Sequence, residues 1–317
     1  MTAKEKYKTI CESGEYYVPL FLQYWWMDAV CKGKQWDVVL AFDREQPTGA
    51  MPFLFGRKYG LTYIIQPQLT QYSGPCYFYP KGLKGQNRLE FEKQTAHQLI
   101  SQIDRIKPAL FIQNFSPQIT NWLPFYWAGY HQTTRYTYRL EDISNPVQIF
   151  ENFDREKRQR KIRRYEQSTT VRYDMSPEAF ADFHRRYWEN KGKKDLLSRD
   201  LIVSVCNTAI MHGNGIIASL FDDNGRLLCA RFVAYDGHNA YALMSAVDAD
   251  LHRSGHNETL IWALLQHLSP ICRSFDFEGS MDEGIEYFYR SFGARQTPFF
   301  EITKCKSLIR PFLRFAT

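Results

Sequence analysis

The pattern of apolar and polar positions in the second half of the chain predicts two helices, three strands, and then alternating helices and strands. Apolar residues recur every three or four positions in the helical segments and every second position in the strands. Ser176 before Pro177 is typical of a helix start. The expected helices cover residues 177–190, 199–212 and 257–267 and a segment around Tyr289, and the expected strands cover residues 215–221, 227–235, 240–247 and 298–303 and a segment around Asp276.

The first half of the chain repeats this order approximately. The expected helices cover residues 19–31 and 88–104 and a segment ending at Gly129, and the expected strands cover residues 36–43, 50–56, 61–65, 109–114 and 131–140. A basic helix over residues 147–165 follows the last of these strands. Two copies of one structural unit are therefore expected, with no low-complexity linker between them.

This order of elements predicts an α/β fold of the mixed α+β kind, in which each half is a mixed, mostly antiparallel sheet flanked by helices. A chain of 317 residues is long enough for two domains with separate cores. We expect an N-terminal domain over residues 1–145 and a C-terminal domain over residues 146–317, which begins with the basic helix.

Composition indicates a globular protein with a local basic patch. The net charge is +6, and residues 155–164 hold seven Lys or Arg residues against one Glu. Seven cysteines without a C-x-x-C pair are typical of free thiols in a reducing compartment. No apolar run reaches the length needed to cross a bilayer, so we expect a cytoplasmic protein without an integral membrane segment.

A short acidic strand followed by an aromatic helix is the strongest candidate for chemistry. In F-D-F-E-G-S, residues 275–280, strand alternation places Asp276 and Glu278 on one face. The amphipathic segment E-G-I-E-Y-F-Y-R-S-F-G follows and ends at Gly293. Because an unpaired buried carboxylate is costly, both acids need partners or a function. Pairing with Arg273 or Arg295, or capping of the next helix, is the structural alternative.

The stretch F-Y-R-S-F-G-A, residues 288–294, resembles the last conserved segment of the GNAT acyltransferase superfamily, in which a helix carries Tyr and, four residues later, Gly. Tyr289 and Gly293 match this spacing. The D-F-E-G-S start, the Arg-rich helix between two similar halves and the opening F-L-Q-Y-W-W-M-D-A-V-C are similar to FemABX-type transferases and their acetyltransferase-like relatives. The resemblance implies two tandem GNAT-like domains and attack of an amine on an activated acyl group.

The resemblance also implies roles for individual residues. Tyr289 would protonate the leaving group, for which a phenol with a pKa near ~10 is suitable; simple packing on its helix is the alternative. Glu278 or Asp276 would act on the amine. The family's oxyanion site, a backbone amide where the fourth strand bulges from the fifth, would fall in residues 240–247. In the first half, the residue four before Gly129 is Phe125, which has no hydroxyl, so we expect that domain to be non-catalytic.

A donor site is implied just before the third helix of the second half. GNAT enzymes that use CoA carry Q/R-x-x-G-x-G/A here, whereas this chain has H-R-S-G-H-N over residues 252–257. Gly255 fits, and His252 and Asn257 depart from the pattern. The expected donor-binding residues are Arg253, Ser254, Gly255, His256 and Asn257. Acyl-CoA is the favoured co-substrate and aminoacyl-tRNA is the alternative. His252 and His256 have no clear third ligand, so we expect no metal site.

Acceptor binding is assigned to the basic helix and to one tyrosine. Arg160, Arg163 and Arg164 have the charge to bind phosphates of a substrate, although a run of charges on a helix is also typical of a solvated face. Tyr72 lies in Y-S-G-P, which is typical of a turn, and the resemblance gives it an acceptor-binding alternative.

Three functions therefore stay open. The first is N-acyl transfer from acyl-CoA to a small-molecule or lipid-linked amine, such as an amino sugar, amino acid or cell-envelope precursor. The second is FemABX-type transfer from aminoacyl-tRNA. The third is a non-catalytic protein that binds an anionic glycan or RNA through the basic helix.

Overall fold

The computed structural model describes residues 1–251, 255–279 and 281–306 of the chain. These residues form two compact units. One contains Met1–Arg135 and the described residues from Pro298 onward, and the other is the continuous segment Tyr136–Thr297. The division falls inside a strand, whereas the expected boundary at residues 145 and 146 lies after it.

The first unit contains six strands among the described residues: five follow the order β1-β2-β3-β5-β12, and β4 pairs with β2. Neighbours pair antiparallel except β3 and β5, which are parallel. The strands are β1 (Gln35–Asp43), β2 (Gln46–Lys58), β3 (Leu61–Ile65), β4 (Cys76–Tyr77), β5 (Leu110–Phe115) and most of β12 (Arg295–Cys305). The helices are α1 (Ala3–Ser13), η1 (Leu20–Leu22), α2 (Tyr24–Val30), α3 (Gly85–Ile106) and α4 (Leu123–Trp127).

The second unit contains six strands in the order β6-β11-β10-β9-β8-β7. Only the β10–β11 pair is parallel among the ladders described for this unit. The strands are β6 (His131–Leu140), β7 (Thr169–Arg172), β8 (Gly215–Asp222), β9 (Leu227–Tyr235), β10 (Asn239–Val247) and β11 (Ser274–Gly279). The helices are α5 (Pro146–Glu151), η2 (Arg155–Gln159), α6 (Arg160–Tyr165), η3 (Glu166–Ser168), α7 (Pro177–Asn190), α8 (Arg199–Met211), η4 (Ala249–Leu251), α9 (His256–Leu268) and α10 (Glu283–Arg290).

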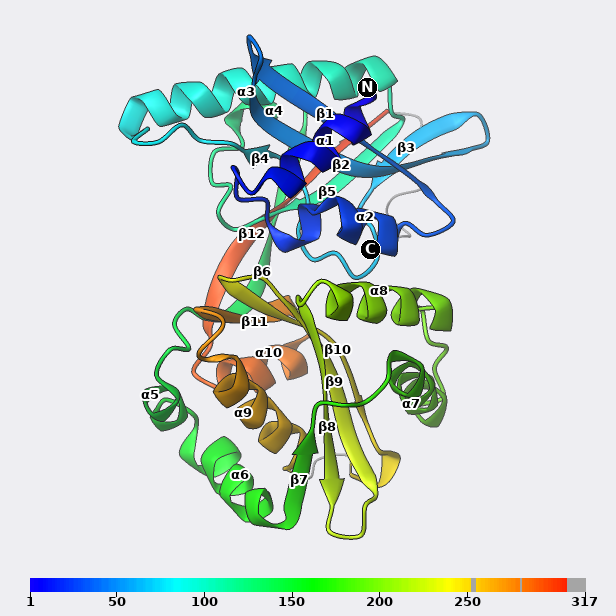
Figure 1. The fold of residues 1–317 in the computed structure, drawn as a ribbon, viewed down its shortest axis with the longest axis vertical. Coiled ribbons are helices and arrows are strands. Elements are labelled where there is room, and N and C mark those ends of the chain that lie inside the picture. Colours follow the sequence, from blue (N-terminus) through cyan, green and yellow to red (C-terminus); the bar gives the residue numbers. More distant parts are fainter. Residues whose placement is uncertain (252–254, 280, 307–317) are drawn as a thin grey trace. The chain divides into compact units, whose positions relative to one another are not determined.

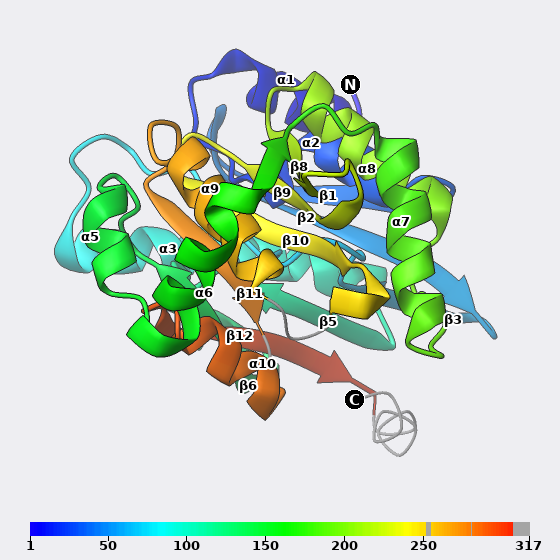
Figure 2. The ribbon, with the colours of Figure 1, turned by 90° about the horizontal axis from the view of Figure 1, so that it is seen from below.

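Helices cover both faces of the second unit's sheet (Figures 1 and 2). Helices α5, α6, α9 and α10 lie on one side of β8–β10, and α7 and α8 lie on the other. The core on the α9 side joins apolar side chains of all of these strands to Leu260, Leu264 and Phe292. Because α10 packs against this core through Phe288 and Tyr289, the core fixes the position of the candidate tyrosine.

The mixed α/β fold expected from the sequence is confirmed, with differences at particular elements. Helix α7 begins at Pro177 because the Ser176 hydroxyl accepts a hydrogen bond from the Ala179 amide. The helix expected over residues 147–165 is broken into α5, η2 and α6. At the break, the Asp154 carboxylate accepts from the Lys157 amide and the Asp154 amide donates to the Ser291 carbonyl.

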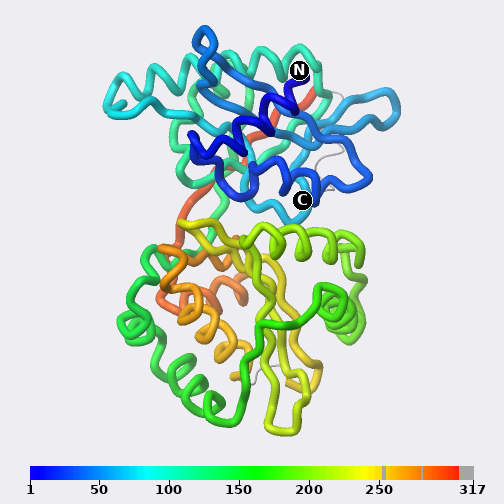
Figure 3. The backbone as a smooth tube through the Cα atoms, in the orientation of Figure 1, coloured from blue at the N-terminus to red at the C-terminus, as the bar shows by residue number. Residues whose placement is uncertain are grey.

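The chain crosses between the units twice. It enters the second unit within β6 and returns within β12 (Figure 3). In the first unit, β12 forms a six-residue antiparallel ladder with β5, from Phe300↔Phe115 to Cys305↔Leu110. The first unit is therefore built from two separate stretches of sequence.

Candidate active site

Strands β10 and β11 part in the middle of the second unit. Their parallel ladder covers three positions and ends where Tyr241 pairs with Asp276. Strand β10 continues to Val247 against β9, with an irregular register between Tyr241 and Met244. Past this point, the backbone of β10 is no longer paired with β11 in the described ladder. The bulge lies inside the segment in which the sequence places an oxyanion site.

Asp276 is fully buried, and three of its contacts are described. The Thr137 hydroxyl donates to its Oδ1 at 2.5 Å, and the Glu278 amide donates to the same atom at 2.9 Å. The Arg139 Nε lies 3.9 Å from Oδ2. The cation beside Asp276 is thus Arg139, rather than the Arg273 or Arg295 named as structural alternatives. These contacts join β6 to β11 at the point where the ladder ends.

Glu278 has an unusual backbone and an unusual carboxyl group. Its φ is +70°, in the left-handed region that residues other than glycine rarely adopt, at a cost of roughly 1–2 kcal/mol. The β6–β11 register is also irregular between Asp276 and Gly279. Burial raises the pKa of Glu278 well above its ordinary value, and the nearby Asp276 charge raises it further. A strained residue with a perturbed pKa is typical of a functional site.

Tyr289 reaches the same place from α10. Its ring stacks on Phe277, with centroids 5.0 Å apart and an interplanar angle of 28°. Burial raises the pKa of the phenol, Arg231 lowers it, and Glu278 and Asp276 raise it. The two carboxylates and the phenol predicted from the sequence therefore interact electrostatically with one another.

Three residues of this site, Thr137, Arg139 and Arg231, were not predicted from the sequence. Each comes from a strand and belongs to no local motif, and Thr137 is 139 positions from its partner Asp276. Arg231, in β9, is buried, and its Nη2 donates to the Asn257 side-chain oxygen at 3.2 Å. A charged residue inside an otherwise apolar strand pattern was the available signal for Arg231.

The structure describes three of the five expected donor residues. Arg253 and Ser254 lie outside the described residues. A Cβ placed on Gly255 would lie 2.8 Å from the Lys161 Cβ and 2.8 Å from the Tyr165 ring, so glycine permits close packing of α6 on the start of α9. The His256 ring lies 4.1 Å from the Tyr165 ring, and burial lowers the pKa of His256.

The basic helix divides into buried and exposed cations. Arg158 is buried and donates from Nη1 to Glu258 at 2.8 Å, and Lys161 lies 3.1 Å from the same oxygen. The three cations assigned to the acceptor, Arg160, Arg163 and Arg164, are exposed. Arg160 pairs with the exposed Glu156 at 3.2 Å. Arg163 and Arg164 form no ion pair within the described part of the chain.

Tyr72 belongs to the first unit and is packed among aromatic rings. It is 5% exposed, and the rings of Phe21 and Phe299 meet it edge to face. Gln71 donates a hydrogen bond to its hydroxyl at 3.0 Å. The chain bends at Gly74, which has a φ of +90° and lies against the Phe115 ring, and Ser73 forms a β-bridge with Phe115.

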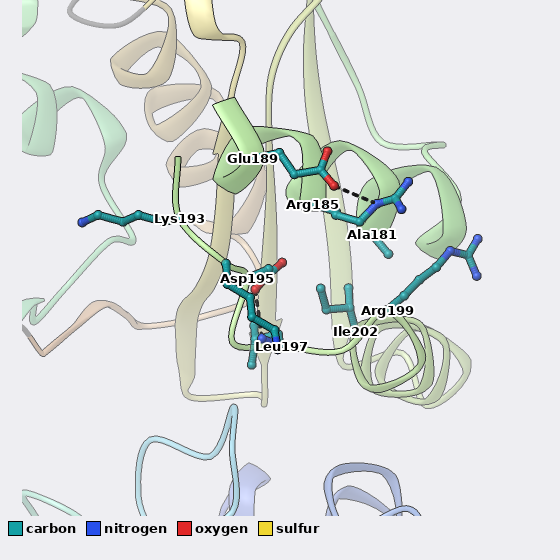
Figure 4. Close-up of a pocket in the computed structure, with 9 residues that line it drawn as sticks. Ala181, Arg185, Glu189, Lys193, Asp195, Leu197, Arg199 and Ile202 are labelled. Carbon is teal, nitrogen blue, oxygen red and sulfur yellow. Dashed lines mark hydrogen bonds and ion pairs between the residues drawn. The ribbon is translucent and has the colours of Figure 1, made fainter. Parts of the chain in front are cut away.

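A pocket of about 250 Å³ lies on α7, α8 and the loop that joins them (Figure 4). Arg185 and Glu189 pair at 3.9 Å on its rim, and Lys193 extends away from the other labelled side chains. The loop is held to α7 because Asp195 lies 2.7 Å from the buried His184 Nδ1. Since α7 and α8 cover the face of the sheet opposite α9 and α10, this pocket is separate from the carboxylates and Tyr289.

Within the described ranges, no group of three or more His, Cys, Asp or Glu residues could hold a metal ion. All seven cysteines are free. None of the described helices is both long enough and apolar enough to cross a membrane.

Comparisons with known proteins agree with this fold. Residues 153–288 match the model of the acetyltransferase (GNAT) domain. The fold is similar to that of FemX (TM-score 0.69, 11% identity, covering 95% of this chain and 96% of that one). It is also similar to a tandem GNAT protein from the clavulanic acid biosynthesis pathway (TM-score 0.52, 10% identity, 96% and 94% covered).

A third similar structure is the C-terminal domain of a putative lysylphosphatidylglycerol synthetase from Agrobacterium fabrum (TM-score 0.55, 13% identity, 88% of each chain covered). The sequence has no match among curated proteins. Residues 153–288 thus carry a match to the GNAT acetyltransferase domain, which indicates an acyltransferase. Its overall fold is FemX-like, with GNAT-like architecture in both units.

Proposed function

We propose that the second unit transfers an acyl group from an activated carrier to the nitrogen of an amine. The observation that carries the proposal is the convergence of Glu278, Asp276 and Tyr289 where β10 and β11 part. A carbonyl bound where the two strands part would lie near a candidate base, a candidate acid and the irregular backbone of β10.

Each group has one task in this mechanism. Glu278 takes a proton from the attacking amine, and its raised pKa makes it a better base near neutral pH. The nitrogen bonds to the acyl carbon while a backbone amide of the β10 bulge stabilises the oxyanion. The bond from carbon to the carrier's sulfur or oxygen then breaks, and Tyr289 gives its proton to that atom. Asp276 accepts hydrogen bonds from Thr137 and from the Glu278 amide, and it serves to hold β11 and to raise the pKa of Glu278.

Catalysis is confined to the second unit in this proposal. Aligning the parallel ladders of the two units places Ile112 and Asn114 of β5 where β11 has Asp276 and Glu278. Phe125 takes the place of Tyr289, since each lies four residues before a glycine with positive φ. The first unit has neither the base nor the acid.

The donor is acyl-CoA or an aminoacyl-tRNA, and one observation favours each. The GNAT domain match favours a CoA thioester. The packing of Lys161 and Tyr165 on Gly255 favours the aminoacyl ester, because this glycine already serves helix packing at the place where the family binds CoA phosphates. In either case, Arg160, Arg163 and Arg164 are exposed to bind phosphates, and a small-molecule or lipid-linked amine would be the acceptor.

The experiment supplies the purified chain with a panel of amine acceptors and either mixed acyl-CoAs or charged tRNA, and measures amide formation by mass spectrometry. We expect transfer from one donor class, with Tyr289→Phe and Glu278→Gln each lowering the rate about 10²- to 10⁴-fold. Tyr287→Phe is the matched control, because Tyr287 lies on the same helix and is 37% exposed. Equal rates for Tyr289→Phe and Tyr287→Phe would contradict the proposed acid.

A further inference from the structure

Arg231 is a buried cation without a carboxylate partner. The residue is 4% exposed, and its Nε is buried without a hydrogen-bond partner within the described residues. Its one described hydrogen bond goes to a neutral group, the Asn257 side chain. Every Asp and Glu of the chain lies in the described ranges, and none forms an ion pair with Arg231 there. Among the described residues, no carboxylate compensates the guanidinium charge.

Arg158, another buried arginine in the same unit, has the partners that Arg231 lacks among the described residues. Arg158, 5% exposed, is paired with Glu258 and also donates from Nε to the Ser291 hydroxyl at 2.7 Å. Burying an ion without such partners costs several kcal/mol, so an uncompensated arginine in a core strand reduces stability. A residue kept at such a cost indicates a function.

The groups around Arg231 are two phenols and a thiol. On β9, Arg231 shares a face with Cys229 and Val233, and both belong to the core against which Tyr289 packs. Its electrostatic neighbours are Tyr289, Cys229 and Tyr187, in decreasing order of effect. Of the two phenols, Tyr187 already has a cation, because Lys191 Nζ lies 2.5 Å from its hydroxyl. Tyr289 is thus the phenol whose negative charge Arg231 would meet.

We propose that Arg231 is a positioning residue that supplies the counter-charge for Tyr289 when Tyr289 acts as the acid. The proton of the phenol passes to the sulfur or oxygen of the leaving carrier, and the negative charge stays on Tyr289 opposite the guanidinium. Glu278 then releases to solvent the proton that it took from the amine, and solvent reprotonates Tyr289. The step rests on the proposed function, whereas the charge pair itself can be measured without any acyl transfer.

An unpaired cation is well suited to this role. An arginine already paired with a carboxylate would offer little attraction to a new anion, whereas Arg231 is oriented and desolvated before the reaction. The other groups near Tyr289 are Glu278 and Asp276 on β11, Tyr187 on α7 and Tyr138 on β6. None of these carries a positive charge, so Arg231 is the one described cation that can balance a phenolate at this position.

The test places a fluorinated tyrosine, whose phenol is more acidic than that of tyrosine, at position 289 and follows its titration by ¹⁹F NMR in the full chain. We expect Arg231→Met to raise the titration midpoint by roughly one pH unit or more, and Arg231→Lys to raise it less. The matched control is Arg290→Met, which removes an exposed charge one residue away on the same chain segment. If Arg231→Met and Arg290→Met shift the midpoint equally, the inference is wrong.

Stability separates this role from a structural one. Because Met replaces an uncompensated ion by an apolar side chain of similar length, we expect Arg231→Met to melt at or above the wild-type temperature. A marked loss of stability with an unchanged midpoint would assign Arg231 to packing instead. If Arg231→Met does not fold, Arg231→Gln, which keeps a donor for Asn257 and removes the charge, gives the same comparison.

The outcome for this inference and the outcome for the proposed function are distinguishable. A midpoint that depends on Arg231 in a chain that transfers no acyl group would support the charge pair and contradict the proposed function. Transfer activity with a midpoint independent of Arg231 would contradict the charge pair alone.

Discussion

Replacing Glu258 by Gln is expected to loosen the start of α9. The Glu258 side chain is 4% exposed, and one of its oxygens lies 2.8 Å from Arg158 Nη1 and 3.1 Å from Lys161 Nζ. Gln keeps the shape of the side chain and removes the charge. The substitution therefore leaves two cations facing a neutral amide.

The exposure of the two cations determines how much folding stability the Glu258→Gln substitution removes. The Lys161 side chain is 36% exposed and can be hydrated, whereas the Arg158 side chain is 6% exposed and cannot. Breaking a buried pair costs about 3–5 kcal/mol. Since one ion rather than two loses its compensation, we expect the lower end, about 3 kcal/mol. The control is Glu156→Gln, which breaks a pair with Arg160 whose side chains are 70% and 80% exposed, and costs at most about 0.5 kcal/mol.

Amide hydrogen exchange measured by mass spectrometry reports the effect locally. With Glu258→Gln, peptides from α9 are expected to exchange roughly a hundredfold faster, because each 1.4 kcal/mol is about a factor of ten. Peptides from α3 in the first unit serve as the internal reference and should be unchanged. If α9 exchanges no faster with Glu258→Gln than with Glu156→Gln, the ion pair does not hold α9 and the reasoning from burial is refuted.

Three further predictions concern Glu278, Gly255 and the exposed arginines. Because the pKa of Glu278 is raised in the folded protein, the contribution of this residue to folding stability is fully present below the unfolded pKa of ~4.3 and is lost as the pH rises through the folded pKa. Glu278→Gln should therefore melt at a higher temperature than wild type at neutral pH and at the same temperature at pH 4. A melting-temperature difference that is constant across pH would contradict this sign. Gly255→Ala should cost about 1–3 kcal/mol in urea unfolding, because its Cβ would meet α6 at 2.8 Å, and an unchanged midpoint would show that α6 can move. Reversing the charges of Arg163 and Arg164 should weaken tRNA or CoA binding in fluorescence anisotropy and reduce its salt dependence without changing the melting temperature; unaltered binding would leave them as solvated surface.

The sequence predicted the elements whose signals are local. Helix α7 follows from Ser176 and Pro177, and the segment with Asp276, Glu278 and Tyr289 follows from strand alternation and a helix that ends at glycine. Helix α1 was missed although its signal is local: Thr2 and Glu5 form a capping box that is readable as T-x-x-E.

The features that were not predicted from the sequence depend on contacts between residues that are distant in the sequence. The break at Asp154 is formed with the Ser291 carbonyl, and no pattern within residues 147–165 encodes it. The pairing of Asp276 with Arg139 was missed because strand neighbours are set by topology, and nearby Arg273 and Arg295 are equally good partners by charge. Gly255 was expected to bind the donor's phosphates, whereas in the structure it permits close packing of α6, a contact between residues far apart in the sequence.

The two-part construction of the first unit has a consequence for biosynthesis. The ribosome finishes β5 long before it reaches residues 300–305, which pair with that strand. At typical elongation rates the interval is roughly ten to thirty seconds. Meanwhile the second unit emerges as one uninterrupted stretch and can fold first. Until β12 arrives, the nascent first unit exposes an open strand edge, and a chaperone or the ribosome surface would have to shield it from neighbouring polypeptides.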